Sequence, residues 1–382
     1  MGCARVFWVF GLLVLGLAGG AAAVLSGGAR MCKFPAIYNF GDSNSDTGGR
    51  SAALLEVPPP NGETFFGKPS GRFCDGRLII DLLAGELGLP YLNAYLDSIG
   101  TNFRHGANFA TGGSSIRQGG YSPFHLDVQI SQFMRFKSST TTLYKQLSSN
   151  KGSRRLCEMN LPRPEDFSKA LYTMDIGQND LAYGFQHTTE EQVVASIPDI
   201  LNQLSRAVQQ LYKEGARFFW VHNTGPIGCL PYNVIYYPSK SGNLDRNGCV
   251  EPQNKVAQEF NRQLKDMVTQ LRAKLQHATF TYVDVYSAKY ALISNAKNQG
   301  FDDPLKFCCG SYDGYHVDCG KKVIVNGTIY GNPCEDPSRH ISWDGIHYSQ
   351  AANILVANHI FNGSLSNPPI PVAEACQSAK DV

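Results

Sequence analysis

Short apolar segments alternate with amphipathic helical patterns along most of the chain, and this alternation limits the possible folds more than any other feature. Strands are predicted at 34–40, 170–176, 217–222 and 279–285, and helices at 78–85, 190–214, 253–277 and 349–361. Strands that alternate with helices form parallel sheets with right-handed crossovers, and helices then cover both faces. The sequence therefore predicts a three-layer α/β/α fold with a mostly parallel, doubly wound sheet.

The first 25 residues differ from the rest of the chain. An uncharged apolar run at 6–25 follows Arg5 and ends in small residues, which is the pattern of a secretory signal peptide. We expect residues 1–25 to be a signal peptide that is cut near Ala23, with an uncleaved anchor as the alternative. Residues 26–382 are predicted to form a single domain. The expected location is the secretory pathway, with export to the extracellular space or cell wall, or retention in the Golgi lumen for the anchor.

Cysteines and sequons fit that compartment. The chain has eleven cysteines, and ten remain once Cys3 is lost with the leader. An even number in an oxidising compartment predicts disulfides. Candidate partners are Cys319 and Cys334 for the adjacent Cys308 and Cys309, and Cys249 for Cys229. Two sequons predict glycosylation at Asn326 and Asn362.

Charge and motif content exclude several classes of function. There are 34 basic and 32 acidic residues, a formal net charge of +2, and no basic block, which argues against nucleic acid as a partner. The near-neutral balance also favours a neutral substrate. The sequence contains no C-x-x-C pair, H-E-x-x-H motif, Walker loop or G-x-G-x-x-G motif, so neither a zinc site nor a nucleotide site is predicted. The G-x-S-x-G elbow of α/β-hydrolases is absent as well.

Four short polar segments carry the groups that acyl transfer requires. Ser43 follows the first predicted strand, near the start of an expected helix whose free N–H groups would favour a developing negative charge. Further donors come from the backbone N–H of Gly113 and from the amide of Asn179. Asp344 lies three residues before His347, close enough to orient the imidazole. Each segment alone is also compatible with an ordinary turn, loop or helix cap. Together they supply a nucleophile, a base, an orienting acid and oxyanion donors.

In the order of these segments the sequence resembles the GDSL esterases and lipases, a branch of the SGNH hydrolases, and in particular their secreted, early-nodulin-like plant members. The resemblance runs from about residue 34 to residue 361. The matching blocks are Gly41-Asp42-Ser43 with Asp46, Asn108 to Ser115, Gly177 to Asp180, and Asp344 to His347. Gly49 and Cys74 replace the Asn and Ser of many relatives, but neither is a catalytic position. The resemblance implies a flavodoxin-like SGNH fold.

The resemblance also implies a carboxylic ester hydrolase. Ser43 would attack the acyl carbonyl, His347 would take its proton, and Asp344 would orient His347. The oxyanion would be held by the N–H groups of Ser43 and Gly113 and by the amide of Asn179. No metal, organic cofactor, nucleic acid or stable protein partner is expected. The expected substrate is an ester, with O-acetyl groups of cell-wall polysaccharide as the first candidate.

Other activities remain open. The same triad would serve a lipase or an acyltransferase acting on lipids or small metabolites, and a non-catalytic wall protein is a remote alternative. Five aromatic residues are candidates for a sugar or acyl cleft, although core positions are the favoured interpretation: Tyr91, Tyr95, Phe103, Tyr121 and Phe124. The polar segment 138–155 is predicted to be a lid or a surface loop.

Overall fold

The computed structural model describes most of the chain that follows the expected leader. The described residues are 31–97, 99–149, 160–238, 242–311 and 316–377. The predicted signal peptide at 1–25 lies outside them, as does Cys157, so cleavage of the leader stays a prediction. Among the helices in these ranges, none is both long and apolar enough to cross a membrane.

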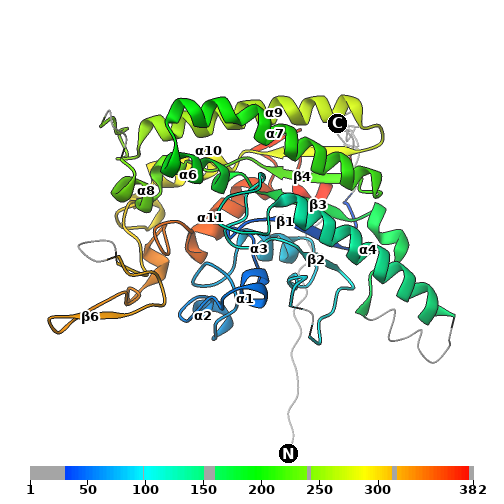
Figure 1. Ribbon diagram of the computed structural model, residues 1–382, viewed down its shortest axis with the longest axis horizontal. Coiled ribbons are helices and arrows are strands. Elements are labelled where there is room, and N and C mark those ends of the chain that lie inside the picture. The colour runs from blue at the N-terminus through cyan, green and yellow to red at the C-terminus, as the bar shows by residue number, and fades with distance from the viewer. Residues whose placement is uncertain (1–30, 98, 150–159, 239–241, 312–315, 378–382) are drawn as a thin grey trace, which may run out of the picture. The chain divides into compact units, whose positions relative to one another are not determined.

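A six-stranded sheet forms the centre of the fold (Figure 1). Its strands are β1 (Ile37–Gly41), β2 (Gly106–Asn108), β3 (Leu171–Asp175), β4 (Phe218–His222), β5 (Thr279–Val283) and β8 (Ser366–Asn367). They lie in the order β2-β1-β3-β4-β5-β8; β1 to β5 are parallel, and β8 pairs antiparallel with β5. The parallel part has the 2-1-3-4-5 order of a flavodoxin-like, doubly wound sheet, which confirms the predicted fold class.

Helices cover both faces of this sheet, as Figure 1 shows. On one face α4 (Leu126–Ser148), α7 (Glu190–Lys213) and α9 (Glu251–Lys274) pack together, and on the other α3 (Ile79–Glu86) packs against α11 (Gln350–Phe361). The helix α10 (Val285–Ser294) contacts α11. Shorter elements are α1 (Gly49–Ala53), α2 (Glu63–Phe66), α6 (Gln178–His187), α8 (Pro231–Tyr236) and the hairpin of β6 (Val323–Val325) and β7 (Thr328–Tyr330). Because both faces are covered, all five residues of β1 are buried.

The polar segment 138–155 is not the loop or lid that the sequence predicted, as far as it is described. Its first part, up to Ser148, continues helix α4. The apolar stripe that begins at Leu126 includes Phe133 and Phe136, which are buried, and this stripe holds the helix against the sheet. Tertiary packing of that stripe outweighs the weak helix propensity of the serines and threonines that follow.

Four disulfides lie within the described residues, and they join cysteines both near and distant in the sequence. They are Cys32–Cys376, Cys229–Cys249, Cys308–Cys334 and Cys309–Cys319. The pairing of Cys229 is therefore as predicted, and the two adjacent cysteines take different partners. The expectation that all ten cysteines form disulfides is wrong for Cys74, which is free and buried. Its Sγ accepts the N–H of Gly76 at 3.4 Å, so it serves as a small core side chain.

Candidate active site

The predicted nucleophile, base and acid lie in contact at the carboxyl ends of the strands. The Oγ atom of Ser43, in the turn after β1, is 2.7 Å from Nε2 of His347. The Nδ1 atom of the same imidazole is 2.6 Å from Oδ2 of Asp344. The other carboxylate oxygen of Asp344 accepts the backbone N–H of Ile346 at 3.0 Å and that of His347 at 2.7 Å. This chain of contacts is the arrangement in which an imidazole can take a proton from a serine hydroxyl.

The surroundings of Ser43 differ from the sequence prediction in one respect. Ser43 is not at a helix N-terminus: residues 43–45 form a turn, and α1 begins only at Gly49. The spacing follows from Asp46, whose carboxylate accepts the N–H groups of Gly48, Gly49 and Arg50 and so occupies the free donors at the start of α1. The dipole of α1 is thus directed at Asp46 rather than at the nucleophile.

Gly41 makes the sharp exit from β1 possible. A Cβ atom at this position would lie 2.7 Å from the carbonyl oxygen of Asp175, closer than any side chain can pack. A buried glutamine on α4, Gln129, holds both polar groups of Gly41. Its Oε1 accepts the N–H of Gly41 at 3.0 Å, and its Nε2 donates to the carbonyl of Gly41 at 2.8 Å. In the sequence, the only sign of this role is a polar position within the apolar stripe of α4.

The glycine-rich segment is tied to the nucleophile turn by buried side chains. Asp46 also accepts the N–H of Gly112 at 2.7 Å, and Asn108 donates to the carbonyl of Ser45 at 2.6 Å. Gly113 has a φ of +82°, a backbone conformation that favours glycine. Within the described ranges, the backbone N–H groups of Ser43 and Gly113 form no hydrogen bond. Both donors are therefore available for a ligand oxygen.

Asn179 is the second residue of α6 rather than part of a turn. Its Nδ2 donates to the carbonyl of Ser114 at 2.9 Å, which leaves the second hydrogen of that amide for another acceptor. Next to it, Asp180 accepts the N–H of Ile116 at 2.7 Å and that of Arg117 at 3.0 Å. The third sequence block is thus built onto the glycine-rich segment, as an oxyanion site would require.

Two buried carboxyl groups near the site have raised pKa values. Burial, and then the charge of Asp175, raise the pKa of Asp42 from an ordinary 3.8 to about 7, although hydrogen bonds from Asn44 act in the opposite direction. Burial likewise raises the pKa of Asp180 to about 6, against the lowering effect of its backbone hydrogen bonds. Both groups hold loops of the site in place, so their protonation state bears on its stability.

A cluster of two disulfides supports the loop that carries Asp344 and His347. Trp343 is buried against Cys308, Cys309 and their partners. Its carbonyl oxygen accepts the N–H of Cys308 at 2.9 Å and that of Cys309 at 2.6 Å, and its own N–H donates to the carbonyl of His347 at 2.7 Å. Sequence reasoning missed this support, although the adjacent cysteines and the neighbouring Trp343 were its visible signal.

The aromatic residues proposed from the sequence divide into two groups. Tyr91, Tyr95 and Phe103 pack against the core, as the favoured interpretation had it. Phe124 is half-buried. Tyr121 is 41% exposed, so the core interpretation is wrong for this residue. Its Cβ would lie 3.3 Å from a Cβ at Gly113, which places it beside a predicted oxyanion donor.

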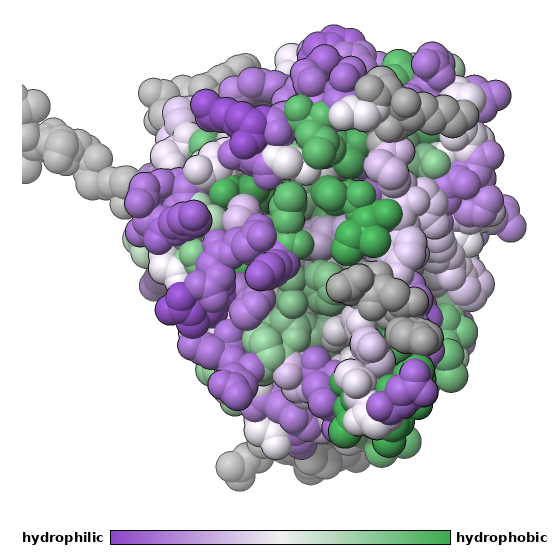
Figure 2. Space-filling model, turned by 90° about the vertical axis from the view of Figure 1, so that its left-hand side faces the viewer, coloured by the Kyte–Doolittle hydropathy of each residue, from purple (hydrophilic) through white to green (hydrophobic). Residues whose placement is uncertain are grey.

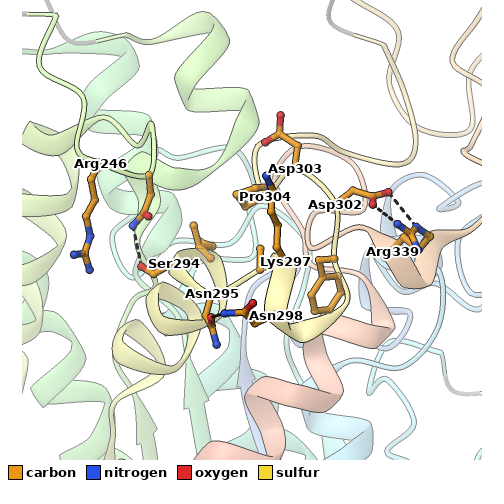
Figure 3. A pocket seen from close by; sticks show the side chains of 13 residues that line it. Arg246, Ser294, Asn295, Lys297, Asn298, Asp302, Asp303, Pro304 and Arg339 are labelled. Carbon is orange, nitrogen blue, oxygen red and sulfur yellow. Dashed lines mark hydrogen bonds and ion pairs between the residues drawn. The ribbon is translucent and has the colours of Figure 1, made fainter.

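A cavity of about 930 Å³ lies elsewhere on the molecule, near the end of α10 (Figure 3). On its rim Arg339 is paired with Asp302, and Asn247 donates to Ser294 at 2.8 Å. None of the predicted site residues lines this cavity. The residues predicted for acyl transfer therefore lie around Ser43, away from this cavity.

Comparison with known proteins agrees with the geometry of the site. A family model described as GDSL-like lipase/acylhydrolase matches residues 37–360. GDSL esterase/lipase At5g14450 of Arabidopsis thaliana is 55% identical over 355 residues, which is 90% of each chain. A second Arabidopsis protein, named Alpha-L-fucosidase 3, is 50% identical over 349 residues, 88% of this chain and 92% of that protein. GDSL esterase/lipase ENOD8 of Medicago truncatula is 45% identical over 356 residues, 90% of each. The chain therefore belongs to the GDSL-like lipase/acylhydrolase family and is a carboxylic ester hydrolase.

Proposed function

We propose that this esterase removes O-acetyl groups from cell-wall polysaccharide in two steps, through an acyl-enzyme on Ser43. The observation that carries the proposal is the hydrogen-bonded chain from Ser43 through His347 to Asp344. A serine hydroxyl that can pass its proton to an oriented imidazole is an activated nucleophile. The protonated imidazole is stabilised by the carboxylate and then returns the proton to the leaving alcohol.

The oxyanion of each tetrahedral intermediate would be held by three donors. These are the backbone N–H groups of Ser43 and Gly113, which have no partner within the described ranges, and the amide of Asn179. Such donors act most strongly where water is excluded, and Ser43 and His347 are 8% and 7% exposed. Water then hydrolyses the acyl-enzyme with His347 as the base. The nucleophile of the first step, the base, the orienting acid and the oxyanion donors are all side chains or backbone amides of the chain.

A short acyl group is favoured by the side chains around the imidazole. The ring of Phe73 lies 5.1 Å from the ring of His347, and a Cβ atom on Gly112 would lie 2.6 Å from Cε2 of Phe73. These contacts leave little room for a long chain between the base and the glycine-rich segment. Acetyl is the smallest acyl group that occurs widely on polysaccharides, so it is the group that we propose.

Secretion is supported by the disulfides and by the sequons. Four disulfides within the described residues suit an oxidising compartment. Asn326 is exposed in the turn between β6 and β7, and Asn362 is exposed at the end of α11. We therefore propose that both carry glycans and that the enzyme acts outside the cell.

An apolar surface beside the site favours a second candidate, a lipase activity. Figure 2 views the molecule from the side of α8 and the β6–β7 hairpin and shows apolar areas bordered by hydrophilic ones. Ile235 on α8 is 44% exposed, and Ile324 and Ile329 in the hairpin are 70% and 50% exposed. Helix α8 adjoins the site, since the N–H of Tyr232 donates to the carbonyl of Gly345 at 3.0 Å. A lipid surface is a ligand that such side chains suit.

An ester panel tests the proposal and separates it from this alternative. The panel contains acetylated xylan, 4-nitrophenyl acetate and long-chain 4-nitrophenyl esters. An aryl α-L-fucoside is tested beside them, because one relative is named as an α-L-fucosidase. We expect turnover of the acetyl esters, and loss of that turnover together with fluorophosphonate labelling in Ser43→Ala. Faster turnover of long-chain esters would favour the lipase. Acetyl-ester activity that survives in Ser43→Ala would refute the acyl-enzyme.

A further inference from the structure

Arg50 brings a positive charge next to Gly113, one of the proposed oxyanion donors. Arg50 lies in the first turn of α1, and its Nη1 donates to the carbonyl oxygen of Gly112 at 3.2 Å. A Cβ atom built on Gly113 would lie 3.5 Å from that Nη1. The guanidinium therefore borders the position of the ester carbonyl in the proposed reaction.

This guanidinium keeps most of its hydrogen-bonding capacity. A guanidinium has five N–H donors, and within the described ranges the bond to Gly112 is the only one that the Arg50 side chain forms. The nearest acid in the sequence, Asp46, is occupied, since its two oxygens accept four backbone N–H groups. Among the described residues no carboxylate forms an ion pair with Arg50. The charge is thus available to a ligand.

In the direction of the base His347, the neighbour of Arg50 is an aromatic ring. A Cβ atom on Gly112 would lie 3.0 Å from Cδ of Arg50 as well as 2.6 Å from the ring of Phe73. Phe73 in turn lies against the ring of His347. The stem of Arg50 and the ring of Phe73 therefore both pack against Gly112, and Nη1 of Arg50 is held by the carbonyl of the same residue.

Gly113 also lies beside a tyrosine. Tyr121 is 41% exposed, and its ring centroid is 5.3 Å from that of Tyr183 on α6 in an edge-to-face contact. Its Cβ and Nη1 of Arg50 both lie within 3.5 Å of the same point, the Cβ position of Gly113. An exposed tyrosine and an unneutralised guanidinium are thus both neighbours of Gly113.

We propose that Arg50 and Tyr121 form a subsite for a uronic acid residue, so that the preferred substrates are acetyl esters of acidic sugars. This inference rests on the proposed function. A guanidinium binds a carboxylate through two parallel hydrogen bonds, and an aromatic ring offers an apolar face to a sugar ring. The net charge of +2 had favoured a neutral substrate. A local charge at the site decides recognition more directly than the net charge of the whole chain.

The test compares two substrates that differ at the carboxyl group, free in one and methyl-esterified in the other, with released acetate as the readout. One is an O-acetylated oligogalacturonide with free carboxylates, and the other is the same oligosaccharide with its carboxylates methyl-esterified. We expect the full-length enzyme at low salt to have a kcat/KM about tenfold or more higher for the free acid, as for a charge-assisted hydrogen bond. In Arg50→Gln this ratio should fall to about one through a higher KM, and Arg50→Lys should retain part of it.

Controls separate charge recognition from a structural effect. Arg206→Gln removes an exposed arginine from α7 and should keep the wild-type ratio. A ratio near one in the wild type would overturn the proposal, and so would an Arg50→Gln enzyme in which the ratio is unchanged. A further outcome would also overturn the uronic acid proposal. If Arg50 favours 4-nitrophenyl hemisuccinate over its methyl ester but does not favour the acidic sugar, the bound carboxylate lies on the acyl side of the substrate. If the wild-type enzyme does not hydrolyse 4-nitrophenyl acetate, the proposed function itself is refuted.

Discussion

The Nε2 atom of His347 lies 2.7 Å from the Oγ atom of Ser43, although 304 residues separate them in the chain. The contact forms because β1 ends at the same edge of the sheet at which the loop before α11 returns. Within that loop, Asp344 uses Oδ1 to fix its own backbone and Oδ2 to fix the imidazole. The two oxygens therefore have separate tasks, and one substitution can distinguish them.

Asp344→Asn should inactivate the enzyme without unfolding it. The Oδ1 acceptor for the two backbone N–H groups is kept, but an NH₂ group now faces Nδ1 of His347. That group favours the tautomer with the proton on Nε2, which can no longer accept the proton of Ser43. We expect kcat for 4-nitrophenyl acetate to fall roughly 10³- to 10⁴-fold. A thermal unfolding curve like that of the wild type is the control, and a kcat within threefold would contradict the assigned role.

Asn179→Ala should lower kcat and leave KM nearly unchanged. The amide is held against the glycine-rich segment by its bond to Ser114, and its other hydrogen is the proposed oxyanion donor. Loss of one such donor lowers kcat by roughly 10²- to 10³-fold. Steady-state kinetics with 4-nitrophenyl acetate measure the effect. Asn202→Ala, on the exposed face of α7, is a matched control that should leave kcat unchanged. A rise in KM alone would place Asn179 in substrate binding instead.

Much of this site could be predicted from the sequence, because each catalytic segment follows a recognisable element or carries its own motif. The strands β1, β3, β4 and β5 are five-residue segments rich in aromatic and aliphatic residues. By contrast, β2 and β8 have three and two residues and exist only through pairing with β1 and β5. Short strands of this kind have no periodicity to detect.

The contacts that hold the loops of the site in place could not be predicted from the sequence, for a related reason. Gln129 lies on α4, 88 residues from the Gly41 backbone that it holds, and a single polar residue within a helical stripe does not indicate its partner. Arg50 likewise meets Gly112 only because Asp46 joins the two segments. Contacts of this kind depend on the tertiary arrangement of loops, which a pattern along one segment does not contain.

Removal of the Cys309–Cys319 disulfide should destabilise the protein and lower its activity together. The bridge closes a loop of about ten residues, for which chain entropy gives roughly 3 kcal/mol of stabilisation. The N–H of Cys309 also holds the carbonyl of Trp343, the residue before Asp344. We expect Cys309→Ser/Cys319→Ser to unfold at a lower denaturant concentration and to lose kcat under native conditions. Cys32→Ser/Cys376→Ser is the control, because that bridge lies outside the Trp343 cluster and its loss should also lower stability. An equal loss of kcat there would contradict a specific role for the Trp343 cluster.

Stability should decrease as pH rises from about 4 to about 7. The pKa of Asp42 is raised to about 7 by burial and by Asp175, whereas in the unfolded chain a carboxyl group ionises near pH 4. Between these values the folded state keeps a proton that the unfolded state has lost, so ionisation favours unfolding. Asp180, with a pKa of about 6, acts in the same direction.

We expect a lower Tm at pH 7.5 than at pH 5. In Asp42→Asn, which resembles the protonated carboxyl group, this difference should shrink, whereas Asp127→Asn on the exposed side of α4 should leave it unchanged. A Tm difference that is the same in the wild type and Asp42→Asn would show that Asp42 does not titrate in this range.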